Sequence, residues 1–120
     1  MYPYGSIVIV AQLADPQGVN PKDRRCIVVT PEAATVGPEG SIRVVAISSV
    51  IPAPLPADLV PLPWQLPFHP ITKLIKPSVA VCGWIAKVDI SQVIDLRGKI
   101  PTKVTAKIAR VLLSLEGRGE

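Results

Sequence analysis

Proline is the residue that most restricts how this chain can fold. Fourteen of its 120 residues are prolines, and eight of these lie in residues 51–77. Proline has no backbone N–H to donate and clashes inside a helix, so we expect this stretch to be an extended loop or, at most, an edge strand. Two uncharged stretches of 14 residues, 44–57 and 59–72, hold seven prolines between them. A membrane span needs about 20 apolar residues in an unbroken helix, so we expect no transmembrane helix.

Residues 51–77 allow two interpretations. The stretch is either a polyproline ligand for an aromatic groove on another protein or an irregular lobe packed on its own domain. Four large apolar residues interleave with the prolines and favour the second interpretation: Leu62, Trp64, Leu66 and Phe68.

Short β-branched runs predict strands in both halves of the chain. The predicted strands are residues 7–10, 26–30, 42–50, 78–82 and 84–90, with a further short one at 93–100. Gly83, between the fourth and fifth strands, indicates a bulge or bend and not a full turn. His69 lies in the proline-rich stretch and is interpreted as a surface or turn histidine, not as a general base.

The apolar period changes near the C-terminus. Val104, Ile108, Val111, Leu112 and Leu115 fall on one helical face and predict a helix over 102–116. Pro101 lies in or before its first turn, and Gly117 is expected to end it. The chain is therefore predicted to be one mainly β domain over residues 1–120, a twisted antiparallel sheet or small barrel finished by a C-terminal α-helix.

The cysteines and the N-terminal residues limit the kind of site and the cellular location that we expect. Cys26 and Cys82 both lie in apolar runs, so buried free thiols are expected in place of a disulfide. There is no CxxC motif or His/Cys cluster, so neither a metal site nor a cofactor is expected. The N-terminal residues contain no signal peptide, which predicts a cytoplasmic protein.

The net charge is unevenly distributed along the chain. Residues 1–60 carry −1 and residues 61–120 carry +5, within a total of +4. A basic excess is compatible with a nucleic acid or an acidic protein as partner. Only 18% of the residues are charged, which points to a dimer that covers part of the apolar surface.

One predicted hairpin places two polar residues together. If strands 26–30 and 42–50 pair around a loop at 31–40, the numbers of paired residues sum to about 72, and Arg24 lies opposite Ser48. Cross-strand neighbours on one face are about 5 Å apart, so the guanidinium and the hydroxyl can converge on one anion. A slip of one residue would separate them onto opposite faces. The alternative is that Arg24 and Arg25 are solvated residues at the end of a loop.

Several segments resemble the MazF/PemK toxins, in the same order along the chain. They are GSIVIV (5–10), DPQG (15–18), Arg24 followed by IVVTP (27–31), VVAISS (44–49), KPSVAV (76–81), KVD (87–89) and GKI (98–100) before the amphipathic helix. No segment is specific alone, and the resemblance depends on their order. Ser6 departs from the family, which usually has Asp there, and Gly83-Trp84 departs from its Asp-Gln.

The resemblance implies a homodimeric SH3-like barrel. It also implies an endoribonuclease that cleaves single-stranded mRNA without metal and is neutralised by an acidic antitoxin. In that family an Arg that opens the second strand and a Thr or Ser that ends the third serve the reaction, and these positions are Arg24 and Ser48. We expect the substrate to contact Lys22, Arg25, Ser49 and Trp84.

A second function remains open for the same fold. The departure at Gly83-Trp84 and the proline-rich stretch also suit a non-catalytic toxin that binds DNA gyrase, as the related CcdB toxins do, or a divergent SH3-like binding module.

Overall fold

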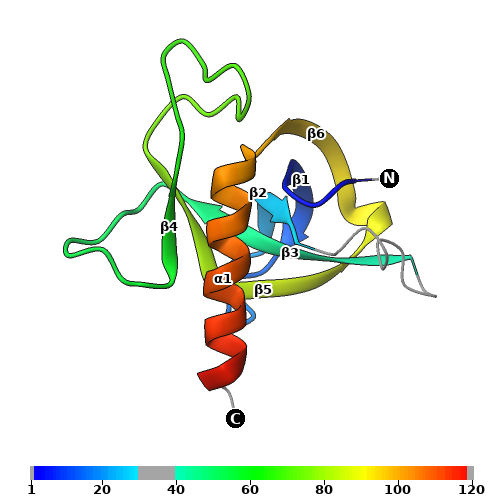
Figure 1. The fold of residues 1–120 in the computed structure, drawn as a ribbon. Coiled ribbons are helices and arrows are strands. Elements are labelled where there is room, and N and C mark those ends of the chain that lie inside the picture. Colours follow the sequence, from blue (N-terminus) through cyan, green and yellow to red (C-terminus); the bar gives the residue numbers. More distant parts are fainter. Residues whose placement is uncertain (1, 30–39, 119–120) are drawn as a thin grey trace.

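The structure is a computed structural model that describes residues 2–29 and 40–118, with side chains up to Leu115. The predicted loop at 31–40 lies almost wholly outside the described residues. The strands are β1 (Ser6–Leu13), β2 (Lys22–Val28), β3 (Ser41–Ser48), β4 (Leu59–Leu62), β5 (Ser78–Asp89) and β6 (Val93–Lys99). A short 3-10 helix, η2 (Ile90–Gln92), precedes β6, and α1 (Thr102–Arg118) ends the chain (Figure 1).

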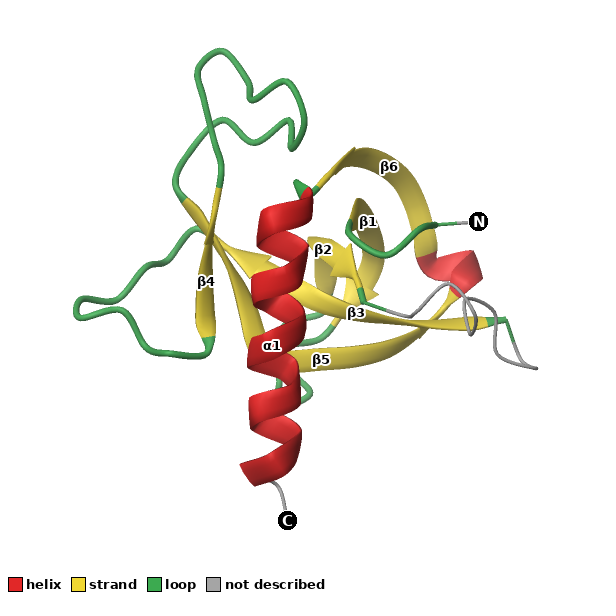
Figure 2. Ribbon diagram, viewed as in Figure 1, coloured by secondary structure: helices red, strands yellow, loops and turns green. Residues whose placement is uncertain are grey.

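The six strands form one antiparallel sheet in the order β4-β5-β3-β2-β1-β6. The sheet curves strongly, and α1 crosses in front of it (Figure 2). This arrangement confirms the predicted mainly β fold with a C-terminal helix. β4 is an edge strand inside the proline-rich stretch, the most regular structure expected there.

β5 unites the two strands predicted at 78–82 and 84–90. Its pairing with β3 is interrupted once, because Val45 pairs with Ile85 whereas the next residue, Ala46, pairs with Val81. The extra β5 residues between these pairs include Gly83. The bulge predicted at this glycine is therefore confirmed.

Two apolar cores occupy the two faces of the sheet. Successive strand residues point to opposite faces, so Ile7 and Ile27 belong to one core, and Val8 and Cys26 belong to the other. Both predicted thiols, Cys26 and Cys82, are buried and free. Burial raises the pKa of Cys26 to about 12 and that of Cys82 to about 11, so both stay protonated and unreactive near neutral pH.

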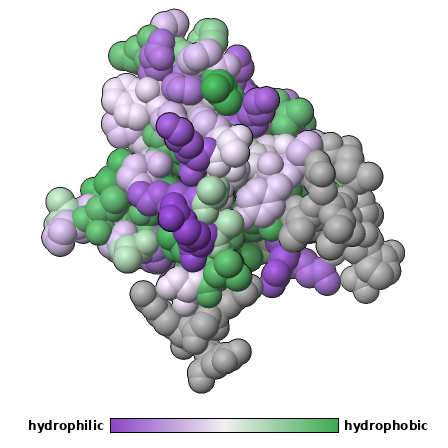
Figure 3. Space-filling view, in the orientation of Figure 1, coloured by the Kyte–Doolittle hydropathy of each residue, from purple (hydrophilic) through white to green (hydrophobic). Residues whose placement is uncertain are grey.

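α1 covers the first core with its predicted apolar face. Ile108 is fully buried, and the neighbours that pack around it are Val104, Val111, Leu112 and Leu115. Hydrophilic side chains lie over the exposed side of the helix (Figure 3). The helix continues through Gly117 to Arg118, so the prediction that this glycine ends it was wrong. Glycine in a helix costs only about 1 kcal/mol relative to alanine, so it does not have to end the helix. In the described part of the chain, no helix is long and apolar enough to cross a membrane.

The proline-rich stretch packs differently from the prediction. Leu62 is buried as expected, but Trp64, Leu66 and Phe68 are 44%, 70% and 50% exposed. These three side chains therefore do not anchor the stretch on its domain. Leu62 and Leu74, both buried in the first core, do so, and hydrogen bonds within the stretch fix its shape. The Nδ1 atom of His69, for example, accepts the backbone N–H groups of Ile71 and Thr72, which confirms the interpretation as a turn histidine.

Candidate functional site

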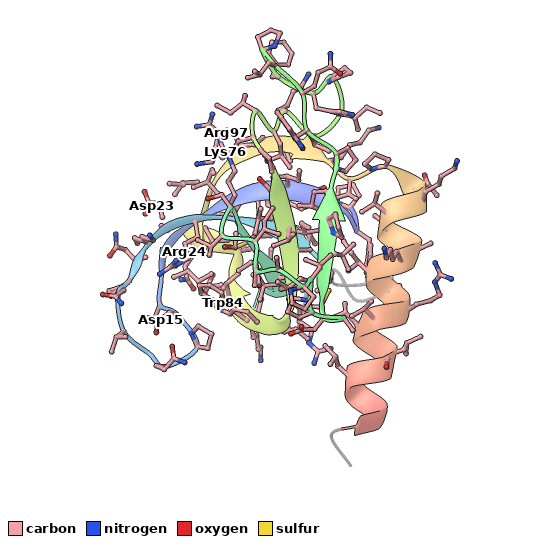
Figure 4. The ribbon with its side chains drawn as sticks, turned by 90° about the vertical axis from the view of Figure 1, so that its left-hand side faces the viewer. Asp15, Asp23, Arg24, Lys76, Trp84 and Arg97 are labelled. Atoms are coloured by element: carbon pink, nitrogen blue, oxygen red, sulfur yellow. The ribbon has the colours of Figure 1, made fainter. Side chains whose placement is uncertain are left out.

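A cleft of about 760 Å³ brings together all six residues singled out from the sequence. They come from β2, from the end of β3 and the residues after it, and from β5: Lys22, Arg24, Arg25, Ser48, Ser49 and Trp84. Figure 4 looks onto this side of the molecule, with Arg24 between Trp84 below and Lys76 above.

The pairing of β2 with β3 follows the predicted register. Cys26 pairs with Ala46 and Val28 pairs with Val44, so the numbers of paired residues sum to 72. Arg24 and Ser48 lie two residues beyond the last pair on each strand, and two steps along a strand return to the same face. Both side chains line the cleft, and Arg24 lies within β2 and not at the end of a loop.

The Arg24 guanidinium is held by two backbone carbonyls. Its Nε donates to the carbonyl oxygen of Leu13 at 2.7 Å, and its Nη2 donates to that of Asn20 at 2.7 Å. A guanidinium has five N–H groups. Within the described residues these bonds use two of them, so three are left for a ligand in the cleft. This is a preorganised donor for an anion with several oxygens, such as a phosphate.

The loop between β1 and β2 holds one of these carbonyls in place. The Asp15 carboxylate accepts the backbone N–H groups of Gln17 and Val19, each at 3.0 Å, and the Asn20 side-chain amide at 3.2 Å. The bond from Val19 contributes most to lowering the pKa of Asp15, aided by those from Asn20 and Gln17. Asp15 therefore acts on Arg24 through Asn20, which both residues bind.

Ser48 and Trp84 line the same cleft as the guanidinium. The Ser48 Oγ accepts the backbone N–H of Val50 at 3.0 Å, which leaves its O–H free to donate. The guanidinium carbon of Arg24 lies 4.8 Å from the centre of the Trp84 ring, within cation–π range. The departure from the family pattern at Trp84 therefore places an aromatic ring directly against the candidate catalytic arginine.

Sequence reasoning missed part of the charged wall. Lys76 and Arg97 also line the cleft, as do the carboxylates of Asp23 and Asp95. With the three cations of β2, the cleft holds five cationic and two acidic side chains, a formal charge of +3. The spacing of Asp95 and Arg97, two apart on a predicted strand, indicates a shared face. Nothing local to Lys76 or Arg97 shows that β6 and the proline-rich stretch line the same cleft as β2.

The charge of the cleft limits what it attracts. A concave surface with a cationic excess concentrates anions. Among the described residues, no group of three or more His, Cys, Asp or Glu side chains comes together to hold a metal ion. The arrangement is therefore that of a cationic cleft with one fixed guanidinium and with the Ser48 O–H available to donate.

Several solved structures share this fold. The toxin MazF-mt6 of Mycobacterium tuberculosis superposes with a TM-score of 0.69 at 17% identity, over 92% of this chain and 96% of that one. MazF of Deinococcus radiodurans gives 0.71 at 22% identity over 96% of both chains. A mycobacterial endoribonuclease in complex with its cognate antitoxin gives 0.70 at 12% identity, over 98% of this chain and 96% of that one.

The similarity lies in the fold. No protein-family model matches the sequence, and no curated protein sequence matches it either. The chain nevertheless has the MazF toxin fold over almost its whole length, as the resemblance in the sequence implied.

Proposed function

We propose that this protein is a MazF-like toxin that cleaves single-stranded mRNA without metal. The observation that carries the proposal is the Arg24 guanidinium, which is fixed by two carbonyls in a cationic cleft that Ser48 also lines, on a MazF fold. Fold similarity alone does not assign an activity, because one fold hosts many functions. The residue types and their placement in the cleft supply the missing argument.

The chemistry uses the RNA itself as the nucleophile. The 2′-hydroxyl attacks the adjacent phosphorus, the bond from phosphorus to the 5′-oxygen breaks, and the products carry a 2′,3′-cyclic phosphate and a 5′-hydroxyl. Negative charge grows on the non-bridging oxygens in the transition state. The three remaining N–H groups of Arg24 stabilise that charge, and the Ser48 hydroxyl orients the phosphate or the 2′-hydroxyl.

The other cleft residues bind the substrate. Lys22 and Arg25 contact the RNA backbone, and Ser49 adds a hydroxyl beside Ser48. Trp84 offers a flat apolar surface of the kind on which unpaired bases stack. Because single-stranded RNA exposes both its bases and its phosphates, this combination suits it better than a duplex.

The same proposal includes the partners of the toxin. An acidic antitoxin would neutralise the cationic cleft, and one of the structures with this fold is an endoribonuclease bound to its cognate antitoxin. A homodimer of SH3-like barrels would cover exposed apolar side chains such as Leu113, which is 68% exposed on α1. We place the protein in the cytoplasm, where mRNA is available.

Cleavage of a long single-stranded RNA in the presence of EDTA tests the activity. The wild type should produce fragments with 5′-hydroxyl and cyclic phosphate ends. Arg24→Ala should lower the rate about 100- to 1,000-fold, because one preorganised donor contributes about 3–4 kcal/mol. Lys103→Ala is the matched control, since this exposed α1 cation is not among the cleft residues. No cleavage of several unrelated RNAs, or equal activity of Arg24→Ala, would refute the proposal.

A further inference from the structure

Residues 63–77, here called the lobe, are built around one buried threonine. The Thr72 side chain is fully buried, and its Oγ1 donates to the carbonyl oxygen of Pro63 at 2.8 Å. The same oxygen accepts the backbone N–H of Leu74 at 3.2 Å. This hydroxyl ties the two sides of the lobe together, which gives the lobe a defined shape even though it is rich in proline.

The lobe is also joined to β6. The backbone N–H of Lys99 donates to the carbonyl oxygen of Ile71 at 3.1 Å. Gly98 lies so close that a Cβ atom there would be 2.6 Å from the carbonyl oxygen of Thr72. The lobe therefore rests directly on the last strand, above the sheet in Figure 1.

This contact makes the lobe one wall of the cleft. Leu74 and Lys76 of the lobe line the cleft together with Arg97 of β6. Figure 4 shows Lys76 and Arg97 next to each other, at the far side of Arg24 from Trp84. The Arg97 Nε forms an ion pair with the Asp95 carboxylate at 2.8 Å, which limits where its guanidinium points.

Strand register places an apolar floor below these cations. Ile9 pairs with Arg25 on one side and with Asp95 on the other, so the three form a row across β2, β1 and β6 on one face. Ile47 and Leu74 line the same cleft. Arg25 and Arg24 are consecutive, so they point to opposite faces of β2. The floor therefore lies on the other side of β2 from the Arg24–Ser48 pair.

We propose that the lobe and β6 form a second nucleotide subsite, distinct from the Arg24–Ser48 pair. Its apolar floor of Ile9 and Ile47, which lies against the core that contains the buried Leu74, takes a base, and Lys76 and Arg97 bind the phosphate that belongs to it. A nucleotide fits because it combines a flat apolar face with an anion, and the cations rise at the edge of the floor. The inference rests on the proposed function for the identity of the ligand, single-stranded RNA.

Oligonucleotides of increasing length test the subsite. The probes are 2′-O-methyl oligoribonucleotides of two to six residues, which lack the attacking hydroxyl, and their affinity is measured by fluorescence anisotropy competition. A dinucleotide has one internucleotide phosphate and fills only the Arg24 site, whereas longer probes reach the lobe. Lys76→Ala and Arg97→Gln should each weaken hexanucleotide binding about 3- to 10-fold and leave dinucleotide binding unchanged. The slope of log K against log salt should fall by about 0.7 per cation removed.

Lys103→Ala is again the control for loss of one positive charge outside the cleft. Equal losses in the two cleft variants and in this control, or equal losses at every probe length, would overturn the subsite. If the wild type fails to cleave unmodified RNA but the two cleft variants still lose affinity for the longer probes only, the proposed activity is refuted and the subsite remains. Cleavage by a wild type whose cleft variants bind like the control would refute only the subsite.

Discussion

Substitution of Gly98 by alanine tests how the lobe is held on β6. A Cβ at this position would lie 2.6 Å from the carbonyl oxygen of Thr72 and 2.9 Å from that of Ile71. Both are backbone atoms, so no side-chain rotation relieves the clash. The lobe must move away from the strand, and the hydrogen bond from the Lys99 N–H to the Ile71 carbonyl, now 3.1 Å long, is then lost.

The expected cost combines three contributions to the free energy of unfolding. Overpacking costs about 1–3 kcal/mol, and the lost hydrogen bond costs about 1 kcal/mol. Alanine also restricts the unfolded chain, which offsets about 0.4–1 kcal/mol of this loss. The net destabilisation is about 1–3.5 kcal/mol. At roughly 4 °C per kcal/mol for a domain of this size, Tm should fall by about 4–14 °C.

Thermal unfolding followed by circular dichroism measures the effect, with Gly83→Ala as the matched control. A Cβ at Gly83 would meet only the carboxylate of Asp58, at 3.2 Å, and that side chain can move. Its Tm should stay within about 3 °C of the wild type. Equal Tm values for the two alanine variants would refute the argument from packing.

The same variants report on function through binding of the 2′-O-methyl hexanucleotide. Because the lobe carries Lys76 into the cleft, Gly98→Ala should weaken this binding, whereas Gly83→Ala should not. A lower Tm for Gly98→Ala with unchanged hexanucleotide affinity would show that the lobe is structural and takes no part in the cleft.

Three further predictions follow from the site and the core. Trp84→Leu should lower kcat for RNA cleavage about 2- to 30-fold through loss of the cation–π contact, and Trp84→Phe should retain most of the activity; equal losses would contradict this role. Asp15→Ala should lower kcat by a larger factor than it changes KM, because the Asn20 carbonyl that holds Arg24 loses its support. Asp15→Asn keeps an oxygen acceptor, so its kcat should fall less. Burial raises the pKa of Cys26 to about 12, so above about pH 9 the unfolded chain loses a proton that the folded chain keeps, and the free energy of unfolding should fall as pH rises. Urea denaturation at pH 8 to 10 measures this slope, which Cys26→Ala should reduce; an identical slope in that variant would contradict the assignment.

Much of the site could be predicted from the sequence because its central residues lie on strands that follow each other in the chain. Strands 26–30 and 42–50 are joined by one loop, so their register followed from the loop position, and the structure pairs Cys26 with Ala46 as expected. That register places Arg24 and Ser48 together. The helical period of α1 and the bulge at Gly83 are likewise local patterns, and both were predicted.

The predictions that failed in the proline-rich stretch did so because its packing depends on contacts that hydropathy does not show. Trp64, Leu66 and Phe68 were expected to be buried because they are large and apolar, but the lobe is held by the buried Leu74 side chain, by the Thr72 hydroxyl and by backbone hydrogen bonds. Hydropathy does not record where a backbone carbonyl points. Lys76 was not recognised as a cleft residue for the same reason.

The sequence by itself determined the strands, the two faces of each strand, the terminal helix and the register of the hairpin that brings Arg24 and Ser48 to the same end of the sheet. These features follow from side-chain periods of two and 3.6 residues and from short connections, all of which are local. Only the tertiary structure decided that β6 returns to pair with β1, that the lobe rests on Gly98, and that Trp84 faces Arg24. These contacts join residues far apart in the chain, and their geometry depends on how the whole sheet curves.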